Sequence, residues 1–411
     1  ILGATMLRPD IKPALAVKPL INIGALLDIT TGYYVKGKHG ENILLGGLGQ
    51  LTGVVGPGNS FKSTVMHYMM LSAANRISAA TETIMMTYDT EINIHESRLQ
   101  KFAERFEYLK EKNIINEGIW TITDKTVYYA DKWFDETKKY LENKEKNAKD
   151  YTYETPFLDR DGKSLIKMIV PTFGEVDSLS EFETSDVAKI QDENLLGDSG
   201  GNTIHMRSGL AKTRFFMEIP NIAGTSNHYF LMTAHMGKEM AMASGPYQQM
   251  PTKQLQHMRM GDKVKGVTGK FFFLLNNCWE AVSAKPFINQ GTKAPEYPRD
   301  TIENNDSGNI DLNIVTLKQL RSKSGPTGIT VELIVSQTEG VLPSLSEFHY
   351  LKEMDRFGLD GNLQSYSLVL YPDVKLGRTT VRGKIDNDHK LRRALNITAE
   401  LCQMHQYHKA L

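Results

Sequence analysis

The chain has 411 residues, with 48 Lys and Arg against 48 Asp and Glu, so its formal net charge is zero. This balance excludes a polybasic, histone-like protein. It does not exclude DNA binding, because a local basic patch can be offset by acidic residues elsewhere. A hydrophobic content of 40% with 23% charged residues predicts a folded globular chain, and the length predicts two or three structural units.

Membrane insertion and secretion are not predicted. No run approaches the roughly 18 consecutive apolar residues of a membrane helix, and Arg8 and Asp10 near the beginning of the sequence do not fit a secretory signal. The two cysteines, Cys278 and Cys402, lie far apart and lack metal-binding spacing. We therefore expect two buried free thiols and a reducing, intracellular compartment.

The first elements in chain order predict a parallel sheet. Residues 1–41, with three prolines, read as an N-terminal arm or oligomerisation segment. A strand at 51–55, a turn, a helix from 63 to about 78 and a buried strand at 83–89 follow. This order is a βαβ unit, which predicts an α/β fold with a mostly parallel twisted sheet flanked by helices.

The remaining elements extend this sheet and end in a small α+β unit. Between the third core strand and the next strand, residues 236–270 show no clear periodicity, and long stretches of this kind are usually functional or disordered. In order, we expect a helical pattern at 95–112, a solvated helix at 135–150, strands near 169–176, 228–234 and 271–275, a hairpin of 312–317 with 329–335, and a strand, basic turn and amphipathic helix within 365–411.

A glycine-rich segment lies between the first strand and the first helix. Backbone N–H groups of such a turn and of the helix N-terminus bind phosphates, so the segment predicts a P-loop. Lys62 would neutralise the β- and γ-phosphates, and Ser63 would bind Mg²⁺ through its hydroxyl. Phe61 replaces the usual glycine before the lysine and must accept a crowded backbone. The segment comprises Gly56, Pro57, Gly58, Asn59, Ser60, Phe61, Lys62, Ser63 and Thr64.

Two carboxylates follow predicted strands. Glu91 comes just after the strand that follows the P-loop helix, where a carboxylate can orient or deprotonate an attacking water. Asp177 ends a weaker strand, which Pro171 and Gly174 interrupt. We expect Asp177 to bind Mg²⁺ through water and to accept a hydrogen bond from Ser63.

These motifs together resemble the RecA-type recombinases, and within them the UvsX-like recombinases of T-even phages. The resemblance rests on Ser-Phe-Lys-Ser at 60–63, Tyr-Asp-Thr-Glu at 88–91, Asp-Ser-Leu at 177–179 and the approach to the P-loop from Pro19. It runs from about residue 19 to 405. It implies a RecA-like ATPase core at 42–345, with insertions near 110–165 and 280–310, a C-terminal unit at 346–411, and ATP and Mg²⁺ as cofactors.

Further roles are implied by the resemblance alone. His235, at the end of the third core strand, would sense the γ-phosphate and pass its state to the following loop. Lys318 and Arg321, with Lys323 as a substitute for Arg321, would reach the ATP of a neighbouring subunit. Arg98, seven residues after Glu91, would stack on the adenine.

The resemblance also implies two DNA-facing loops, near 180–210 and 236–270. The second holds six Lys or Arg against two acids, a net charge of +4 on a neutral chain. Basic residues on a glycine-rich loop suit binding to a phosphate backbone without sequence readout. In the first loop only His205, Arg207 and Lys212 are suited to phosphate. The expected DNA-binding residues are Arg207, Lys238, Arg259, Lys263, Lys265, Gly266, Gly269 and Lys270.

The resemblance therefore implies a DNA-dependent ATPase that forms helical filaments on single-stranded DNA, with ATP at subunit interfaces, and that exchanges strands with duplex DNA. A single-strand-binding protein and a loading mediator are expected partners. The expected location is the cytoplasm, which for a viral protein would be the host cell cytoplasm or a phage replication compartment. Three alternatives stay open: a DnaB-type hexameric helicase, an ATP-binding assembly protein without DNA, and a catalytically weak filament subunit. The helicase alternative is based on residues 318–328, Lys-Gln-Leu-Arg-Ser-Lys-Ser-Gly-Pro-Thr-Gly, which resemble a helicase segment.

Overall fold

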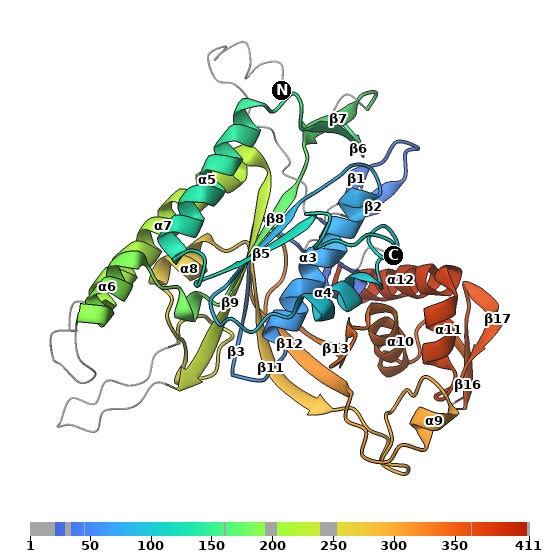
Figure 1. Cartoon of the computed structure of the whole chain (residues 1–411). Coiled ribbons are helices and arrows are strands. Elements are labelled where there is room, and N and C mark those ends of the chain that lie inside the picture. Colours follow the sequence, from blue (N-terminus) through green and yellow to red (C-terminus); the bar gives the residue numbers. More distant parts are fainter. Residues whose placement is uncertain are drawn as a thin grey trace.

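The computed structural model describes residues 21–28, 34–44, 46–159, 162–193, 204–238, 253–362 and 364–408. A large twisted sheet runs through its middle, with helices on both faces and a smaller α+β unit beside it (Figure 1). The expected α/β class, with a mostly parallel sheet and a small C-terminal α+β unit, is confirmed.

The P-loop strand β3 (Leu51–Gly56) lies inside the sheet, between parallel neighbours β11 and β9. The sheet continues in parallel through β8, β4 and β5 on one side, and through antiparallel β12, β13 and β14 on the other. Short β10 pairs with the end of β9. The bounds are β4 (Met85–Asp89), β5 (Trp120–Asp124), β8 (Thr172–Asp177), β9 (His228–Lys238), β10 (Asp262–Val264), β11 (Asn277–Pro286), β12 (Leu312–Ser322), β13 (Thr330–Ser336) and β14 (Gly340–Val341).

The helices divide between the two faces of the sheet. Val54 and Val55 pack into separate apolar clusters because successive strand side chains point to opposite faces. One cluster lies under α3 (Lys62–Ser78) and α4 (Glu96–Ala103). The other lies under α5 (Ala130–Lys146), α7 (Ile204–Ser226) and α8 (Gly269–Leu274), with α6 (Ser185–Glu193) packed on α7 (Figure 1).

Smaller units surround the sheet. The hairpins β1–β2 and β6–β7 lie side by side, joined by a bridge between Gly37 and Phe157. The C-terminal unit has its own apolar cluster, and its helix α12 packs on α2 near the start of the described chain. The bounds are α2 (Ala25–Asp28), β1 (Tyr34–Lys36), β2 (Asn42–Leu44), β6 (Thr152–Leu158), β7 (Leu165–Ile169), η1 (Leu179–Glu181), α9 (Thr301–Asn304), α10 (Pro343–Glu353), β15 (Leu359–Asn362), β16 (Ser365–Leu368), β17 (Tyr371–Leu376), α11 (Val381–Asn387), α12 (His389–Gln403) and the π-helical turn η3 (Met404–His408).

Several predicted elements need correction. The apolar run 271–275 lies mostly in helix α8 instead of a strand, because Phe271, Phe272 and Leu275 bury one face at helical spacing. The strand expected near 169–176 is two strands, β7 and β8, separated by Pro171, and only β8 joins the large sheet. The insertion expected at 280–310 begins inside β11, next to the P-loop strand, so its first residues belong to the core.

The expected DNA loops are also more regular than predicted. The segment 180–210 contains α6 and the beginning of α7, and residues 194–203 lie outside the described part. The segment 236–270 contains the end of β9, strand β10 and the start of α8, and residues 239–252 lie outside the described part.

Cys278 and Cys402 are buried free thiols, as predicted. Among the helices of the described residues, none is long and apolar enough to cross a membrane.

Candidate nucleotide-binding site

The P-loop turns sharply between β3 and α3. Ser60 Oγ and Lys62 Nζ both donate hydrogen bonds to the Pro57 carbonyl oxygen, at 2.8 and 2.7 Å. Asn59 and Phe61 take left-handed backbone conformations, with φ of 56° and 60°. The Lys62 ammonium is thus folded back onto its own loop, and the loop has the strand-to-helix setting that a phosphate site needs.

Phe61 occupies the αL position in which glycine is usual. A left-handed conformation costs a non-glycine residue on the order of 1–2 kcal/mol. Its ring packs against the apolar cluster under α3 and compensates part of this cost. The crowded backbone expected at Phe61 is therefore confirmed.

Two expected site residues, Asp177 and Glu91, lie near Lys62. Burial lowers the pKa of Lys62, while the negative charges of Asp177 and Glu91 act to raise it. These carboxylates come from neighbouring segments, since β8 ends at Asp177 and β4 ends two residues before Glu91. The parallel register of β4 and β8 brings the two strand ends to the same edge of the sheet.

Asp177 is buried at the end of β8, where Thr233 of β9 donates a hydrogen bond to its Oδ1. The Ser63 hydroxyl, on the first turn of α3, is the other expected ligand. Hydroxyl and carboxylate oxygens are donors that Mg²⁺ prefers, and nucleotide sites commonly use one or two of them plus phosphate oxygens. Among the described residues no three His, Cys, Asp or Glu side chains form an all-protein metal cage.

Glu91 and His235 form a direct pair across the carboxyl edge of the sheet. His235 Nε2 donates to Glu91 Oε1 at 2.8 Å, and Ser178 Oγ donates to the same oxygen at 3.1 Å. Burial acts to raise the pKa of Glu91, but the hydrogen bonds from His235 and Ser178 outweigh it, so that pKa lies below its usual value. The carboxylate is ionised and held by two donors.

Asp89 also belongs to the candidate site, although it is not among the residues predicted from the sequence. Its buried carboxylate accepts backbone hydrogen bonds from Glu91, Ile92, Asn93 and Ile94, at 2.8 to 3.0 Å. These bonds fix the turn that carries Glu91. An aspartate at the end of a buried strand, two residues before the catalytic candidate, is a signal for such a turn, because Asp side chains bond to nearby backbone N–H groups.

A buried network beneath the site was also missed. His67 of α3 bonds to Glu175 of β8 at 2.9 Å, Thr87 of β4 donates to Glu175 at 2.8 Å, and Trp120 of β5 donates to Thr87 at 2.8 Å. Burial acts to lower the pKa of His67, but Glu175 outweighs it and holds that pKa above its usual value. The network joins the P-loop helix to the strand that ends at Asp177.

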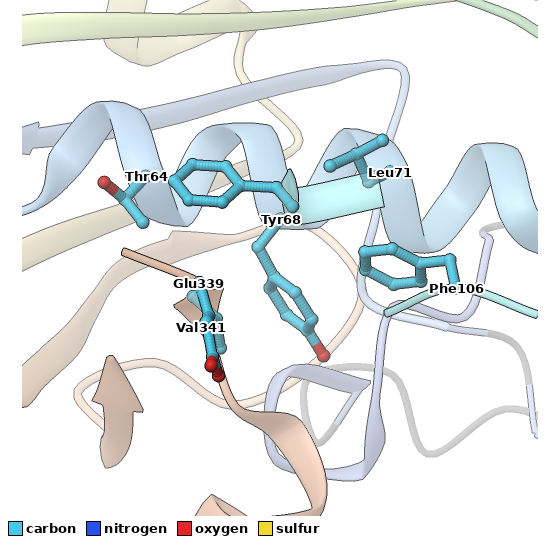
Figure 2. Close-up of a pocket in the computed structure, with 7 residues that line it drawn as sticks. Thr64, Tyr68, Leu71, Phe106, Glu339 and Val341 are labelled. Carbon is cyan, nitrogen blue, oxygen red and sulfur yellow. The ribbon is translucent and has the colours of Figure 1, made fainter. Parts of the chain in front are cut away.

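Arg98 lies beside the first turn of α3. Its Nη2 donates to Thr64 Oγ1 at 3.5 Å, and its guanidinium lies 5.2 Å from the centre of the Phe102 ring. Thr64 and Phe102 also line a cavity of about 10 Å³, whose other lining residues are Tyr68, Leu71, Phe106, Glu339 and Val341 (Figure 2). A cavity of this size holds about one water molecule, so a purine ring would have to bind outside it.

The basic residues expected to act on a neighbouring subunit have contacts within their own chain. Lys318 Nζ donates to the His257 carbonyl at 2.7 Å. Arg321 donates to the carbonyls of Phe273 and Leu275, and Lys323 donates to that of Leu274. Arg321 and Lys323 thus satisfy carbonyls at the C-terminus of α8.

The expected DNA-binding residues lie mainly around β10 and α8. Lys263, Lys265 and Arg259 are exposed, and Lys270 is half-buried on α8. Lys238 is exposed but forms an ion pair with Asp262. Arg207 stands apart on α7, 3.7 Å from Asp186. Lys212 is buried, so the expectation that it meets DNA phosphate is wrong for this conformation.

No family model matches the sequence, and no curated protein matches it. Among solved structures, one match is the crystal structure of the RadB recombinase. It aligns with a TM-score of 0.36 at 14% identity, over 72% of this chain and 92% of that chain. This similarity is too weak to assign a function, which has to be argued from the site.

Proposed function

We propose that the chain is an ATP-dependent recombinase of the RecA type, which assembles on single-stranded DNA. The observation that supports the proposal best is the convergence of Lys62, Asp177 and the Glu91–His235 pair at one edge of the sheet. The strand order, with β9 between the P-loop strand and β8, also supports a RecA-like core. The likeness to phage UvsX-type enzymes is the finer part of this proposal.

ATP would bind with its phosphates on the P-loop. Lys62 would leave the Pro57 carbonyl and bind the β- and γ-phosphates, because a phosphate is a stronger acceptor for an ammonium than a neutral carbonyl. Ser63 and Asp177 would hold Mg²⁺, which supplies charge neutralisation when bound. Glu91, ionised and fixed by the Asp89 turn, would orient and deprotonate the attacking water.

His235 would link hydrolysis to DNA binding. Its Nε2 donates to Glu91, so a γ-phosphate oxygen arriving nearby would compete with Glu91 for this hydrogen bond. The backbone N–H of His235 donates to Ser180 Oγ, and the carbonyl oxygen of His235 accepts the N–H of Lys265. Lys265 belongs to the basic segment, which comprises residues 236–270. A movement of His235 would therefore displace Lys265 and, with it, the proposed DNA loop.

The partners follow from this arrangement. The exposed basic residues around β10 support binding to the DNA backbone without base readout. Lys318 and Arg321 are proposed to complete the ATP site of the next subunit in a filament, exchanging their present carbonyl partners for phosphate oxygens. A cytoplasmic location, a single-strand-binding protein and a loading mediator belong to the same proposal.

The helicase reading has one observation in its favour. Residues 318–328 lie at the end of β12 and in the turn that leads to β13, close to the C-terminus of α8. A hexameric helicase would use the same hairpin to reach its neighbour, so assays of strand exchange and of duplex unwinding distinguish the two activities. The reading as an ATP-binding assembly protein would leave the basic segment without a ligand.

One set of assays tests the proposal. We expect ATP hydrolysis that single-stranded DNA stimulates, together with strand exchange between homologous DNAs. Lys62→Ala should reduce hydrolysis by about 100-fold or more, because it removes a cation from the developing phosphate charge. Retained hydrolysis would show that the P-loop assignment is wrong. Duplex unwinding without strand exchange would favour the helicase, and no effect of DNA would favour the assembly protein.

A further inference from the structure

A buried lysine joins the two segments expected to bind DNA. Lys212 lies on α7, but only 5% of it is exposed. Its Nζ donates to the Gly266 carbonyl at 2.7 Å and to the Ser180 carbonyl at 3.4 Å. Ser180 follows the strand that ends at Asp177, and Gly266 follows β10, so the lysine bridges the stems of the first and second expected loops.

The two stems also touch each other directly. Ser180 Oγ accepts the backbone N–H of His235 at 2.9 Å and donates to the Lys265 carbonyl at 3.1 Å. Gly266 has a φ of +68°, and a Cβ on it would lie 2.5 Å from the Cα of Ser180. Only glycine allows this approach of the two backbones.

The bridge continues to the nucleotide site. His235 donates to Glu91 through its side chain, to Ser180 through its backbone N–H, and accepts the Lys265 N–H at its carbonyl, at 2.8, 2.9 and 2.8 Å. A continuous chain of contacts thus runs from Glu91 through His235 and Ser180 to Gly266 and Lys212.

Burying an ammonium group lowers the stability of the folded state unless the group forms compensating interactions. Burial lowers the pKa of Lys212 to about 8, with Glu181 acting in the opposite direction. A methionine of similar shape would fill the space without this cost. What the lysine adds is two hydrogen bonds to carbonyls of two separate segments, which an apolar side chain cannot make.

We propose that Lys212 is a positioning residue that ties the stems of the two DNA loops into one unit, so that movement of His235 shifts both stems together. The inference rests on the proposed function, because it assumes that these stems lead to DNA-binding loops. It differs from the role expected from the sequence, in which Lys212 would contact phosphate itself.

The two roles differ in their salt dependence. A lysine that contacts phosphate contributes about one released counterion, and its loss reduces the slope of log K against log salt by about 1. A lysine that joins two stems leaves this slope unchanged. Its loss instead weakens the effect of nucleotide on DNA affinity, a coupling that is typically about 5- to 150-fold.

The experiment uses the full chain with Lys212→Met, and Arg214→Met as a matched control. Arg214 is a cation on the same helix, but it is exposed and bonds to Glu218 at 2.9 Å. Affinity for a fluorescein-labelled oligothymidine is measured by anisotropy, with and without a non-hydrolysable ATP analogue, over a range of salt concentrations. DNA-independent ATP hydrolysis is measured in parallel.

We expect the wild type and Arg214→Met to bind DNA more tightly with the analogue. Lys212→Met should lose most of this gain, about 10-fold in affinity, while its nucleotide-free salt slope and its DNA-independent hydrolysis stay within about 2-fold of the wild type. Ser180→Ala, which removes the hydroxyl between His235 and Lys265, should lose the gain as well, and it provides the test if Lys212→Met fails to fold.

Two results would overturn the inference alone: a full nucleotide effect in Lys212→Met and Ser180→Ala, or a salt slope reduced by about 1 in Lys212→Met. If nucleotide has no effect on DNA binding by the wild type, the proposed function fails and the inference fails with it.

Discussion

Phe61 shows at the scale of one residue how the P-loop of this chain departs from the usual pattern. The sequence places a bulky side chain where a glycine is expected, and the backbone there is left-handed, with φ of 60°. The ring is half-buried against the cluster under α3. The position therefore combines backbone strain, which a glycine would remove, with packing, which a glycine would lose.

Two substitutions separate these contributions. Phe61→Ala and Phe61→Gly remove the same ring, but only alanine keeps the steric cost of the left-handed backbone. We expect Phe61→Ala to be less stable than Phe61→Gly by about 1 kcal/mol, despite the greater chain entropy of glycine. The free energy of unfolding in urea measures this difference. An alanine variant at least as stable as the glycine variant would show that Phe61 is not strained.

The helix α5 illustrates what residue patterns miss at the scale of an element. Its Lys/Glu-rich sequence predicts a solvated helix, and most of its charges are indeed exposed or half-buried. Lys144 is buried instead, and its Nζ donates to the Val170 carbonyl at 2.6 Å and to Thr172 Oγ1 at 2.9 Å. These bonds tie the end of α5 to the start of β8, and burial lowers the pKa of Lys144 to about 7.

This pKa predicts a pH-dependent stability. Lysine in the unfolded chain titrates near pH 10.4, so between about pH 7 and 10 the unfolded state binds one more proton than the folded state. The free energy of unfolding should therefore rise with pH in this window, by up to about 1.4 kcal/mol per pH unit. Lys144→Met should remove this contribution. Urea unfolding of both proteins at pH 7, 8 and 9 checks it, and parallel pH profiles would contradict it.

The lysines around β10 and α8 lead to a second prediction for single elements. Lys263, Lys265 and Lys270 lie on or next to β10 and α8. Replacing all three with Gln should weaken DNA binding and make the slope of log K against log salt shallower by up to about 3, because fewer counterions are released. Anisotropy titrations at several salt concentrations measure this slope. The same slope in the variant would exclude these lysines from the DNA interface.

At the scale of the whole molecule, a cluster of arginines and carboxylates attaches the C-terminal unit to the part of the chain that contains the large sheet. Arg382 of α11 is 1% exposed and lies 3.5, 3.9 and 3.3 Å from carboxylate oxygens of Glu303, Asp311 and Glu339. Arg105 and Arg299 also pair with Glu339. Glu339 in turn lines the small cavity beside Thr64 (Figure 2), so the cluster reaches from the C-terminal unit to the P-loop helix.

Removing one member of this cluster should be costly. Arg382→Met removes a positive charge that three carboxylates share. We therefore expect the free energy of unfolding to fall by about 3 kcal/mol. Arg378→Met is the control, since Arg378 belongs to the same unit but donates to the carbonyls of Pro295 and Glu296 and to Asn304. Its loss should be nearer 1 kcal/mol. If urea unfolding shows the same loss of stability in both variants, the ion pairs of Arg382 with the carboxylates contribute no more than ordinary hydrogen bonds.

Elements whose signals are local can be predicted from the sequence. They include the glycine-rich turn between β3 and α3, the βαβ unit, the β12–β13 hairpin and the buried free cysteines, because glycine placement, hydrophobic runs and turn residues act within a few positions. Glu91 and Asp177 could be named as candidates for the same reason, since each follows a predicted strand.

Which of these residues lie close together depends on the tertiary structure. The Glu91–His235 bond joins residues 144 positions apart, and the His67–Glu175 pair joins residues 108 apart. The burial of Lys144 and Lys212 likewise depends on which face of α5 and α7 packs on the sheet. The zero net charge likewise reveals neither the arginine–carboxylate cluster nor the basic segment, because charge balance is a sum over the chain while electrostatic energy depends on distance and burial.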